Sequence, residues 1–227
     1  MGLNSNGKFG DSSQKKSLFP ETIKLARPLA EGTGNSITDK LLGGNKNSIK
    51  EALEAISSDR KVHYSSILLE LLAKTPDLRK NIIDTLADLG IANVIEHILQ
   101  YANDPNTEIR IAVCRAAGKL PFSDSKSIAT LNQKLSDSDE NVKYAALNAL
   151  VLLGHKYHDD SKKEQFRQVL DSLLIALKYD VVPKADFHQL LILDDGSLKG
   201  DLEKMIIEKK KSEEDTSKIE KLLSCLK

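Results

Sequence analysis

The sequence predicts an all-α protein in which pairs of helices stack one after another as a solenoid. Aromatic residues make up 4% of the chain and Trp is absent; a core of Leu, Ile, Val and Ala suits close helix packing better than a β-sandwich. Three segments also align without gaps, and their basic residues Arg79, Arg110 and Lys143 lie 31 and 33 residues apart. That spacing is typical of helical repeats.

Each aligned segment has apolar residues at offsets 0, 3, 4, 7, 8 and 11, which form one face of a helix with a period of 3.6 residues. The second stripe consists of Ile109, Ala112, Val113, Ala116, Ala117 and Leu120. The third consists of Val142, Ala145, Ala146, Ala149, Leu150 and Leu153. The first segment has Asn81 and Thr85 where the others carry Ala. We therefore expect the Ala-rich helices to approach each other closely, and the first to lie nearer an end of the stack or to have a wetter groove.

Partner helices are predicted between these segments, where apolar stripes recur with the same period. They comprise Ile91, Val94, Ile95, Ile98, Leu99 and Ala102, then Ile128, Leu131 and Leu135, with upstream stripes around Leu68 to Ala73 and Ile49 to Ile56 and a downstream stripe from Phe166 to Leu177. Acidic turns follow two of them, at 103–105 and 136–139. In these turns Pro105 is expected to break the chain, and Asp137 or Ser138 to cap the following helix.

Three parts of the chain are predicted from the change in composition along it. Residues 1–46 hold seven of the 12 glycines and are expected to be a flexible tail with a possible short docking helix at 18–26, which would fold on a partner or pack on the body. Residues 47–178 are the repeat solenoid. Residues 179–227 are expected to be a helical cap over the last repeat. Residues 154–161 are expected to be an enlarged connection.

The repeated segments resemble the HEAT-repeat family, particularly its short bacterial-type members. The family pattern is an acidic turn, a helix that opens with Val or Ile and a basic residue, small residues one turn apart, and Leu-Gly at the end. It is matched by Asp104, Ile109-Arg110 and Leu120, and again by Asp137, Val142-Lys143 and Leu153-Gly154. The resemblance implies a right-handed α-solenoid of helical hairpins. It also implies a ladder that pairs the turn Asp with the helix Arg, in doubt at Arg79 and weaker at Lys143.

The resemblance further implies a partner-binding trough, because the second helices of HEAT hairpins line the concave side. Polar residues opposite the buried stripes are the candidates, and the trough would suit a peptide, a helix or another folded protein. They are Asn93, Glu96, His97, Gln100, Thr130, Gln133, Lys134, Gln168 and Asp171. We expect a protein-binding scaffold or adaptor without catalysis, cofactor or membrane contact.

Other chemistry is weighed against plainer interpretations. His155, His158 and Asp159 could ligate a metal with help from His188, but a hydrophilic, exposed loop explains them better. Cys114 lies beside a buried stripe without a nearby base, which predicts packing rather than catalysis. Arg79, Arg110, Arg115 and Lys143 could form a DNA track.

The net charge of zero, from 33 basic and 33 acidic residues, argues against a protein held mainly by phosphate contacts. A DNA repair protein therefore remains the weaker alternative, and an enzyme or chaperone of the bilin-lyase type the stronger one. The two cysteines form no C-x-x-C pair, and neither a signal peptide nor a run of 18 apolar residues is found. These features predict a cytoplasmic protein.

Overall fold

The computed structural model describes residues 36–120, 125–160, 162–178, 197–212, 216–217, 220 and 223–224. These residues belong to one compact unit, Thr33–Lys227. Every regular element among them is a helix, so the predicted all-α class is confirmed. No helix within these ranges is both long and apolar enough to cross a membrane.

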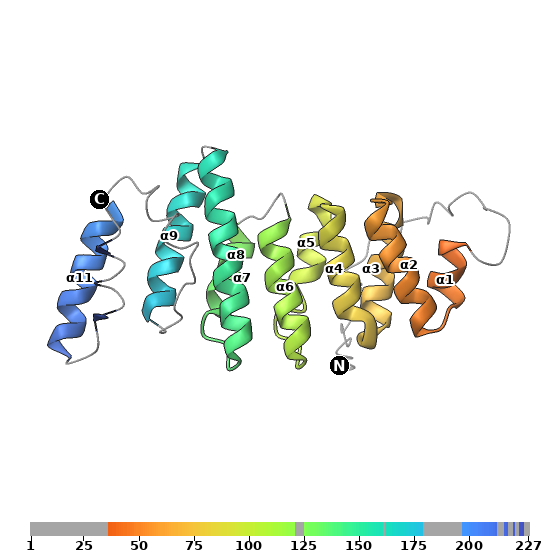
Figure 1. The fold of residues 1–227 in the computed structure, drawn as a ribbon, viewed down its shortest axis with the longest axis horizontal. Coiled ribbons are helices and arrows are strands. Elements are labelled where there is room, and N and C mark those ends of the chain that lie inside the picture. The colour runs from red at the N-terminus through yellow and green to blue at the C-terminus, as the bar shows by residue number, and fades with distance from the viewer. Residues whose placement is uncertain are drawn as a thin grey trace, which may run out of the picture. The chain divides into compact units, whose positions relative to one another are not determined.

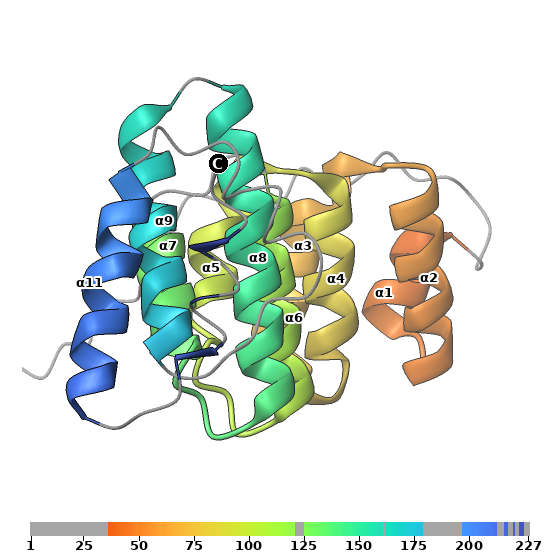
Figure 2. The same cartoon turned by 60° about the vertical axis from the view of Figure 1, so that its left-hand side comes forward.

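The described helices of the repeats form two rows (Figures 1 and 2). The first row contains α2 (Lys46–Ser58), α4 (Arg79–Leu89), α6 (Thr107–Lys119) and α8 (Glu140–Asp159), and the second α3 (Ser65–Lys74), α5 (Ile95–Leu99), α7 (Ser125–Lys134) and α9 (Lys163–Lys178). Each helix of the first row contacts the next one in that row, and α7 contacts α6, α8 and α9. This succession of hairpins confirms the predicted solenoid. Short 3-10 helices, η1 (Val62–Tyr64), η2 (Pro76–Leu78) and η3 (Ala92–Val94), lead into α3, α4 and α5.

Asn106 caps α6 directly after Pro105, and α8 is capped by Asp139 rather than by the predicted Asp137 or Ser138. Asn106 accepts the backbone N–H of Glu108 at 2.9 Å, and Asp139 accepts that of Asn141 at 2.8 Å. Asp104 and Asp137 each accept the backbone N–H two residues further on. Two successive turns of this kind place the helix start beyond the first acid, which leaves the Asp104 and Asp137 carboxylates facing the neighbouring hairpins.

The core is a continuous band of aliphatic side chains between the two rows. Ile82, Ile83, Leu86, Ile98 and Leu131 are fully buried. Burial of side chains of this size contributes roughly 1.5 to 3 kcal/mol each relative to exposure, so this band supplies most of the stability. Thr85 is also buried, whereas Asn81 is half-buried.

Two predicted boundaries are corrected by the structure. Residues 37–43, assigned to the tail, form helix α1 (Ile37–Gly43), because Ser36 caps it and Leu41 is buried against the core. The connection predicted at 154–161 is instead the end of α8, which continues to Asp159 because Tyr157 is buried and holds this turn against the core. Residues 18–26 lie outside the described residues.

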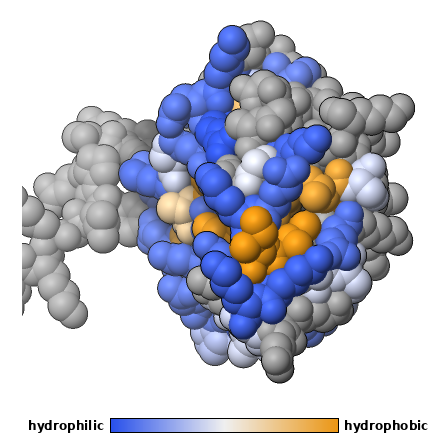
Figure 3. All heavy atoms as spheres, turned by 90° about the vertical axis from the view of Figure 1, so that its left-hand side faces the viewer, coloured by the Kyte–Doolittle hydropathy of each residue, from blue (hydrophilic) through white to orange (hydrophobic). Residues whose placement is uncertain are grey.

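The predicted C-terminal cap is described in part. Helix α11 (Ser197–Lys211) buries Leu202 and Ile206, and Leu223 packs against the core. Residues 179–196 lie outside the described residues. On the face seen from the α11 side, hydrophobic residues gather in one area framed by hydrophilic ones (Figure 3). Ile207 of α11 is more than half exposed, so the outer side of this helix is not purely polar and the capping role stays a prediction.

Helices α6 and α8 of the first row approach each other closely at Gly118. A Cβ placed on Gly118 would lie 2.7 Å from Cα and 2.9 Å from Cβ of Ala149. Only a residue without a side chain fits there unless the helices move apart. The Ala-rich stripe predicted from the sequence thus has a direct packing reason in this pair of helices.

Gly118→Ala should destabilise the protein by about 1 to 3 kcal/mol, because overpacking outweighs the gain in helix propensity. Gly200→Ala is the matched control: Gly200 lies within α11, with no atom within 4 Å of an added Cβ. It should stabilise the protein by up to about 1 kcal/mol. Chemical denaturation of both variants measures the difference, and a Gly118→Ala protein as stable as the parent would contradict the close approach.

Candidate functional site

Two arginines tie adjacent hairpins together through the acidic turns. Arg79 pairs with Asp104 at 2.8 Å, and Arg110 holds Asp137 with two hydrogen bonds of 2.9 and 3.1 Å. Arg110 also donates to the backbone oxygens of Asp104 and Pro105 at 3.0 and 3.2 Å. Arg110 therefore joins the turn before its own helix to the turn of the next hairpin. Two parallel bonds to one carboxylate are the geometry that favours arginine over lysine.

The ladder exists, but its pairs differ from those expected. The Asp104 carboxylate binds Arg79 of the preceding hairpin rather than Arg110, so the rung in doubt at Arg79 is present. Arg79 also donates to the Leu72 backbone oxygen and lies 4.5 Å from the centre of the Tyr101 ring. Lys143 pairs with Glu140 on its own helix at 2.7 Å, so the expected Asp137–Lys143 pair is wrong.

Asp137 is the most heavily bonded carboxylate of the ladder. Its side chain is 6% exposed and lies 3.2 Å from the Lys134 ammonium as well as beside Arg110. Burial by itself would raise the pKa of Asp137, but hydrogen bonds from Arg110, the Asp139 backbone and Lys134 outweigh it and lower the pKa below the ordinary value of 3.8. Asp137 is therefore ionised throughout the neutral range.

A second set of contacts joins the C-terminal ends of α2, α4 and α6. Ser57 donates to Asp88 at 2.7 Å, and Lys119 forms an ion pair with the same carboxylate. Both partners lie 31 residues from Asp88, which is the repeat length. Although burial opposes the shift, these bonds and the charges of Lys119 and Arg60 lower the pKa of Asp88. Neighbouring helices of the first row are thus joined near their C-terminal ends as well as through the acidic turns that precede α6 and α8.

The predicted trough residues lie along α5, α7 and α9, although they differ in exposure. Asn93, Glu96, Gln100, Gln133 and Asp171 are exposed, whereas His97, Thr130 and Gln168 are half-buried.

Several of these side chains are engaged within the protein. Glu96 forms an ion pair with Lys126 at 2.6 Å, and Asp171 one with Arg167 at 3.2 Å. Lys134 departs from expectation, because it is buried and bonded to Asn103 and Asp137. It serves the ladder and is not available to a partner.

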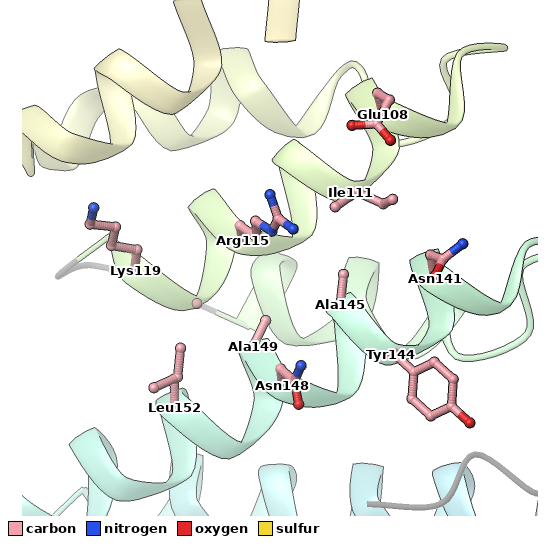
Figure 4. A pocket seen from close by; sticks show the side chains of 11 residues that line it. Glu108, Ile111, Arg115, Lys119, Asn141, Tyr144, Ala145, Asn148, Ala149 and Leu152 are labelled. Carbon is pink, nitrogen blue, oxygen red and sulfur yellow. The ribbon is translucent and has the colours of Figure 1, made fainter. Parts of the chain in front are cut away.

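A groove of about 1010 Å³ lies between α6 and α8 on the first row (Figure 4). Its α6 side consists of Glu108, Ile111, Arg115, Gly118 and Lys119, and its α8 side of Asn141, Tyr144, Ala145, Asn148, Ala149 and Leu152. Buried apolar residues form the floor: Ile111, Ala145 and Ala149. Tyr144 and Leu152 stay 36% and 56% exposed. The groove therefore combines an apolar floor with a mixed rim, as protein-binding and ligand-binding surfaces do.

The sequence argument missed this groove, since it followed the second helices. A signal was available: Tyr144 and Leu152 are large apolar residues on the polar side of α8, eight positions apart and hence on one face of the helix. Arg115 was considered only as part of a DNA track.

The remaining candidates fall in different places. Arg79 and Arg110 are bound into the ladder and Lys143 into an intrahelical pair, so the basic track is not a continuous free surface. His155 and His158 lie on the last turns of α8, where His158 packs edge-on against Phe166 at 5.5 Å. Among the described side chains no three His, Cys, Asp or Glu residues form a group that could hold a metal. His188 lies outside the described residues.

Cys114 is buried, and burial raises the pKa of its thiol to about 12. A thiol this basic is almost wholly protonated at neutral pH, which disfavours a nucleophilic role.

Comparison with protein families places the chain. A family profile described as HEAT repeats matches residues 65–150 and again 95–182. The two matches together cover just over half of the chain, so the protein belongs to the HEAT-repeat family. The comparison with curated proteins found no match.

Asp137→Asn should destabilise the protein by about 3 kcal/mol at pH 7, because it leaves Arg110 and Lys134 facing a neutral side chain. The folded-state pKa of Asp137 is lowered, so its stabilisation is complete above the ordinary carboxyl pKa and is lost as the pH falls through the folded value. The difference between parent and variant should therefore shrink below about pH 4. Urea unfolding at several pH values measures it.

Lys143→Ala is the control for this prediction, because Lys143 corresponds to Arg110 in the next hairpin but, among the described residues, pairs with Glu140 of its own helix. It should change stability by less than about 1 kcal/mol. Equal losses in the two variants would show that the ladder contributes nothing special.

Cys114 should be unreactive in the folded protein. At pH 8 a pKa near 12 instead of 9.0 reduces the thiolate fraction about a thousandfold, and burial also excludes the reagent. In a Cys225→Ser protein, the Ellman reaction should be slow in buffer and fast in denaturant. Fast labelling of the folded protein would contradict the burial.

Proposed function

We propose that the protein is a non-catalytic scaffold or adaptor that binds another protein. HEAT repeats are commonly protein-interaction scaffolds, and this chain has the property that such a role needs. The observation that carries the proposal is the pair of inter-hairpin rungs, Arg79 with Asp104 and Arg110 with Asp137. They hold the exposed faces of successive hairpins in fixed register, so a partner that spans several helices binds a preorganised surface.

The trough over α5, α7 and α9 is the first surface proposed for the partner. Asn93, Gln100 and Gln133 are its exposed amides, and each can donate and accept hydrogen bonds to a polypeptide. The ion pairs of Glu96 with Lys126 and of Asp171 with Arg167 border them. Because both pairs are solvent-exposed, a partner can displace or extend them at small cost. The location proposed for this activity is the cytoplasm.

Two other function classes remain as alternatives. The nucleic-acid alternative loses support from the structure, because Arg79 and Arg110 are 15% and 12% exposed and face carboxylates. The bilin-lyase-like alternative makes a different prediction, a coloured protein that carries a tetrapyrrole, so a purified sample separates it from the scaffold.

Affinity purification of the tagged full chain from its source should recover a stoichiometric protein partner. Gln100→Ala combined with Gln133→Arg should abolish this recovery, since it removes one amide and places a charge at the centre of the trough. The matched control combines Lys50→Ala with Glu54→Arg, which alters two exposed residues of α2 and should leave recovery unchanged.

Three outcomes would count against the scaffold. They are an absent protein partner, a coloured preparation, and a salt-sensitive shift of DNA by the purified protein. Loss of the partner in the α2 control as well would place the binding surface elsewhere.

A further inference from the structure

The groove between α6 and α8 is lined along its length by side chains of both helices. Its floor is formed by Ile111, Ala145 and Ala149, and the contact of Gly118 with Ala149 brings the two helices together beneath it. From Glu108 to Lys119 the groove follows α6 for about 16 Å, or three helical turns. In Figure 4, Ala145 and Ala149 face α6 across the groove. An occupant must therefore be elongated and apolar along one side.

The neighbouring pair, α4 and α6, differs from this groove because the charged residues at the corresponding positions of α4 are paired. Counting from the basic residues 79, 110 and 143, the positions one, five and nine residues later correspond in the three hairpins. On α4 they are Lys80, Asp84 and Asp88. Lys80 pairs with Asp84 at 3.2 Å, and Asp88 binds Lys119 and Ser57. Each charged side chain at these positions of α4 thus forms an ion pair within the protein.

On α8 the same positions carry Tyr144, Asn148 and Leu152, none of which is negatively charged. Arg115 of α6, at the position equivalent to Asp84, is exposed and makes no ion pair among the described residues. Leu152 and Tyr144 expose apolar surface beside it. The exposed charge of Arg115 and the exposed apolar surface of Leu152 thus line the same groove.

We propose that this groove binds an amphipathic helix of a partner protein. Leucine-like side chains would lie over Ile111, Ala145 and Leu152, and an acidic residue on the flank of the helix would pair with Arg115. Glu108 lies seven residues from Arg115 on the same helix, about 10 Å away along the axis, and calls for a basic residue at the opposite end of the partner's flank. The proposal rests on the proposed function and adds the site and the chemistry of the partner.

A helix fits this groove better than an extended strand or a nucleic acid. The groove is lined by side chains of two helices above an apolar floor. Grooves of this kind bind an amphipathic helix, whose residues at i, i+3, i+4 and i+7 insert between the lining side chains. Of the two basic residues that line the groove, Lys119 is paired with Asp88, so Arg115 is the one left for an anionic partner. Glu108 on the same rim would repel phosphate. One cation cannot follow a phosphate backbone.

The test is a display selection against the full-length protein with helices of about four turns. The library fixes leucine at i, i+3, i+4 and i+7 and randomises the flanking positions among Glu, Lys, Gln and Ser. The parent protein should enrich Glu at one flanking position. Arg115→Glu should enrich Lys at that position instead, because the complementary charge is reversed.

Affinities of one selected peptide, measured by fluorescence anisotropy, complete the test. Arg115→Glu should weaken binding roughly tenfold and Arg115→Gln by less, because like charges repel whereas a neutral side chain only loses the pair. Leu152→Lys should weaken binding by a similar factor. Both residues are exposed, and thermal melting verifies that each variant folds. Gln100→Ala with Gln133→Arg, which alters the trough alone, should leave the peptide affinity unchanged.

Selection without any enriched helix, enrichment without a charge preference, or equal affinities of parent and Arg115→Glu would each overturn the groove proposal. The two proposals fail separately. If the natural partner is recovered and lost only in the trough variant, the scaffold stands and the groove proposal is wrong. If charge-matched helices bind the groove while the full chain recovers no protein, the scaffold fails instead.

Discussion

The bidentate pair of Arg110 with Asp137 is the interaction on which the arrangement of this solenoid depends. The aliphatic core supplies far more stabilisation than any ion pair, since dozens of buried side chains each contribute on the order of 1 kcal/mol or more. Such a core specifies register weakly, however, because successive helices carry nearly the same stripe of Ile, Leu, Val and Ala. A planar guanidinium that must meet one carboxylate allows a single alignment. Burial of the core stabilises the stack, and the ion pairs between hairpins favour one alignment of neighbouring hairpins.

The helices of the repeats were predictable from the sequence, whereas the ion pairs between hairpins were not. The helices and their buried stripes follow from a period of 3.6 residues, and that pattern is local. The partners of Arg79 and Lys143 do not follow from it, because the ladder runs forward to the next hairpin and depends on where each acidic turn ends. Asn106 and Asp139 cap α6 and α8, which leaves the carboxylates of Asp104 and Asp137 for the rungs.

The candidate site was less predictable than the fold for a related reason. An exposed polar residue can be recognised on one helix, whereas a groove requires the distance between two helices. Here Gly118 packs against Ala149, and the repeat pattern includes only the second of these two residues. Lys134 illustrates the opposite error: its place on the polar side of α7 predicts exposure, but the Asp137 carboxylate of the adjacent turn draws the ammonium inward. Both differences come from contacts between hairpins.

Charge pairing along the first row also accounts for where a partner can bind. The charged side chains at three corresponding positions of each first-row helix either pair with one another or, as at Arg115, make no ion pair among the described residues. On α4, Asp84 is paired with Lys80 of the same helix and Asp88 with Lys119 of α6. A partner that covers these paired charges gains little binding free energy. The next hairpin has Asn148 and Leu152 at the positions of these acids, so it offers no carboxylate to Arg115 there, and Leu152 exposes apolar surface. A repeat protein can thus create a binding site without altering its core, because the buried stripe and these corresponding positions lie on different faces of the same helix.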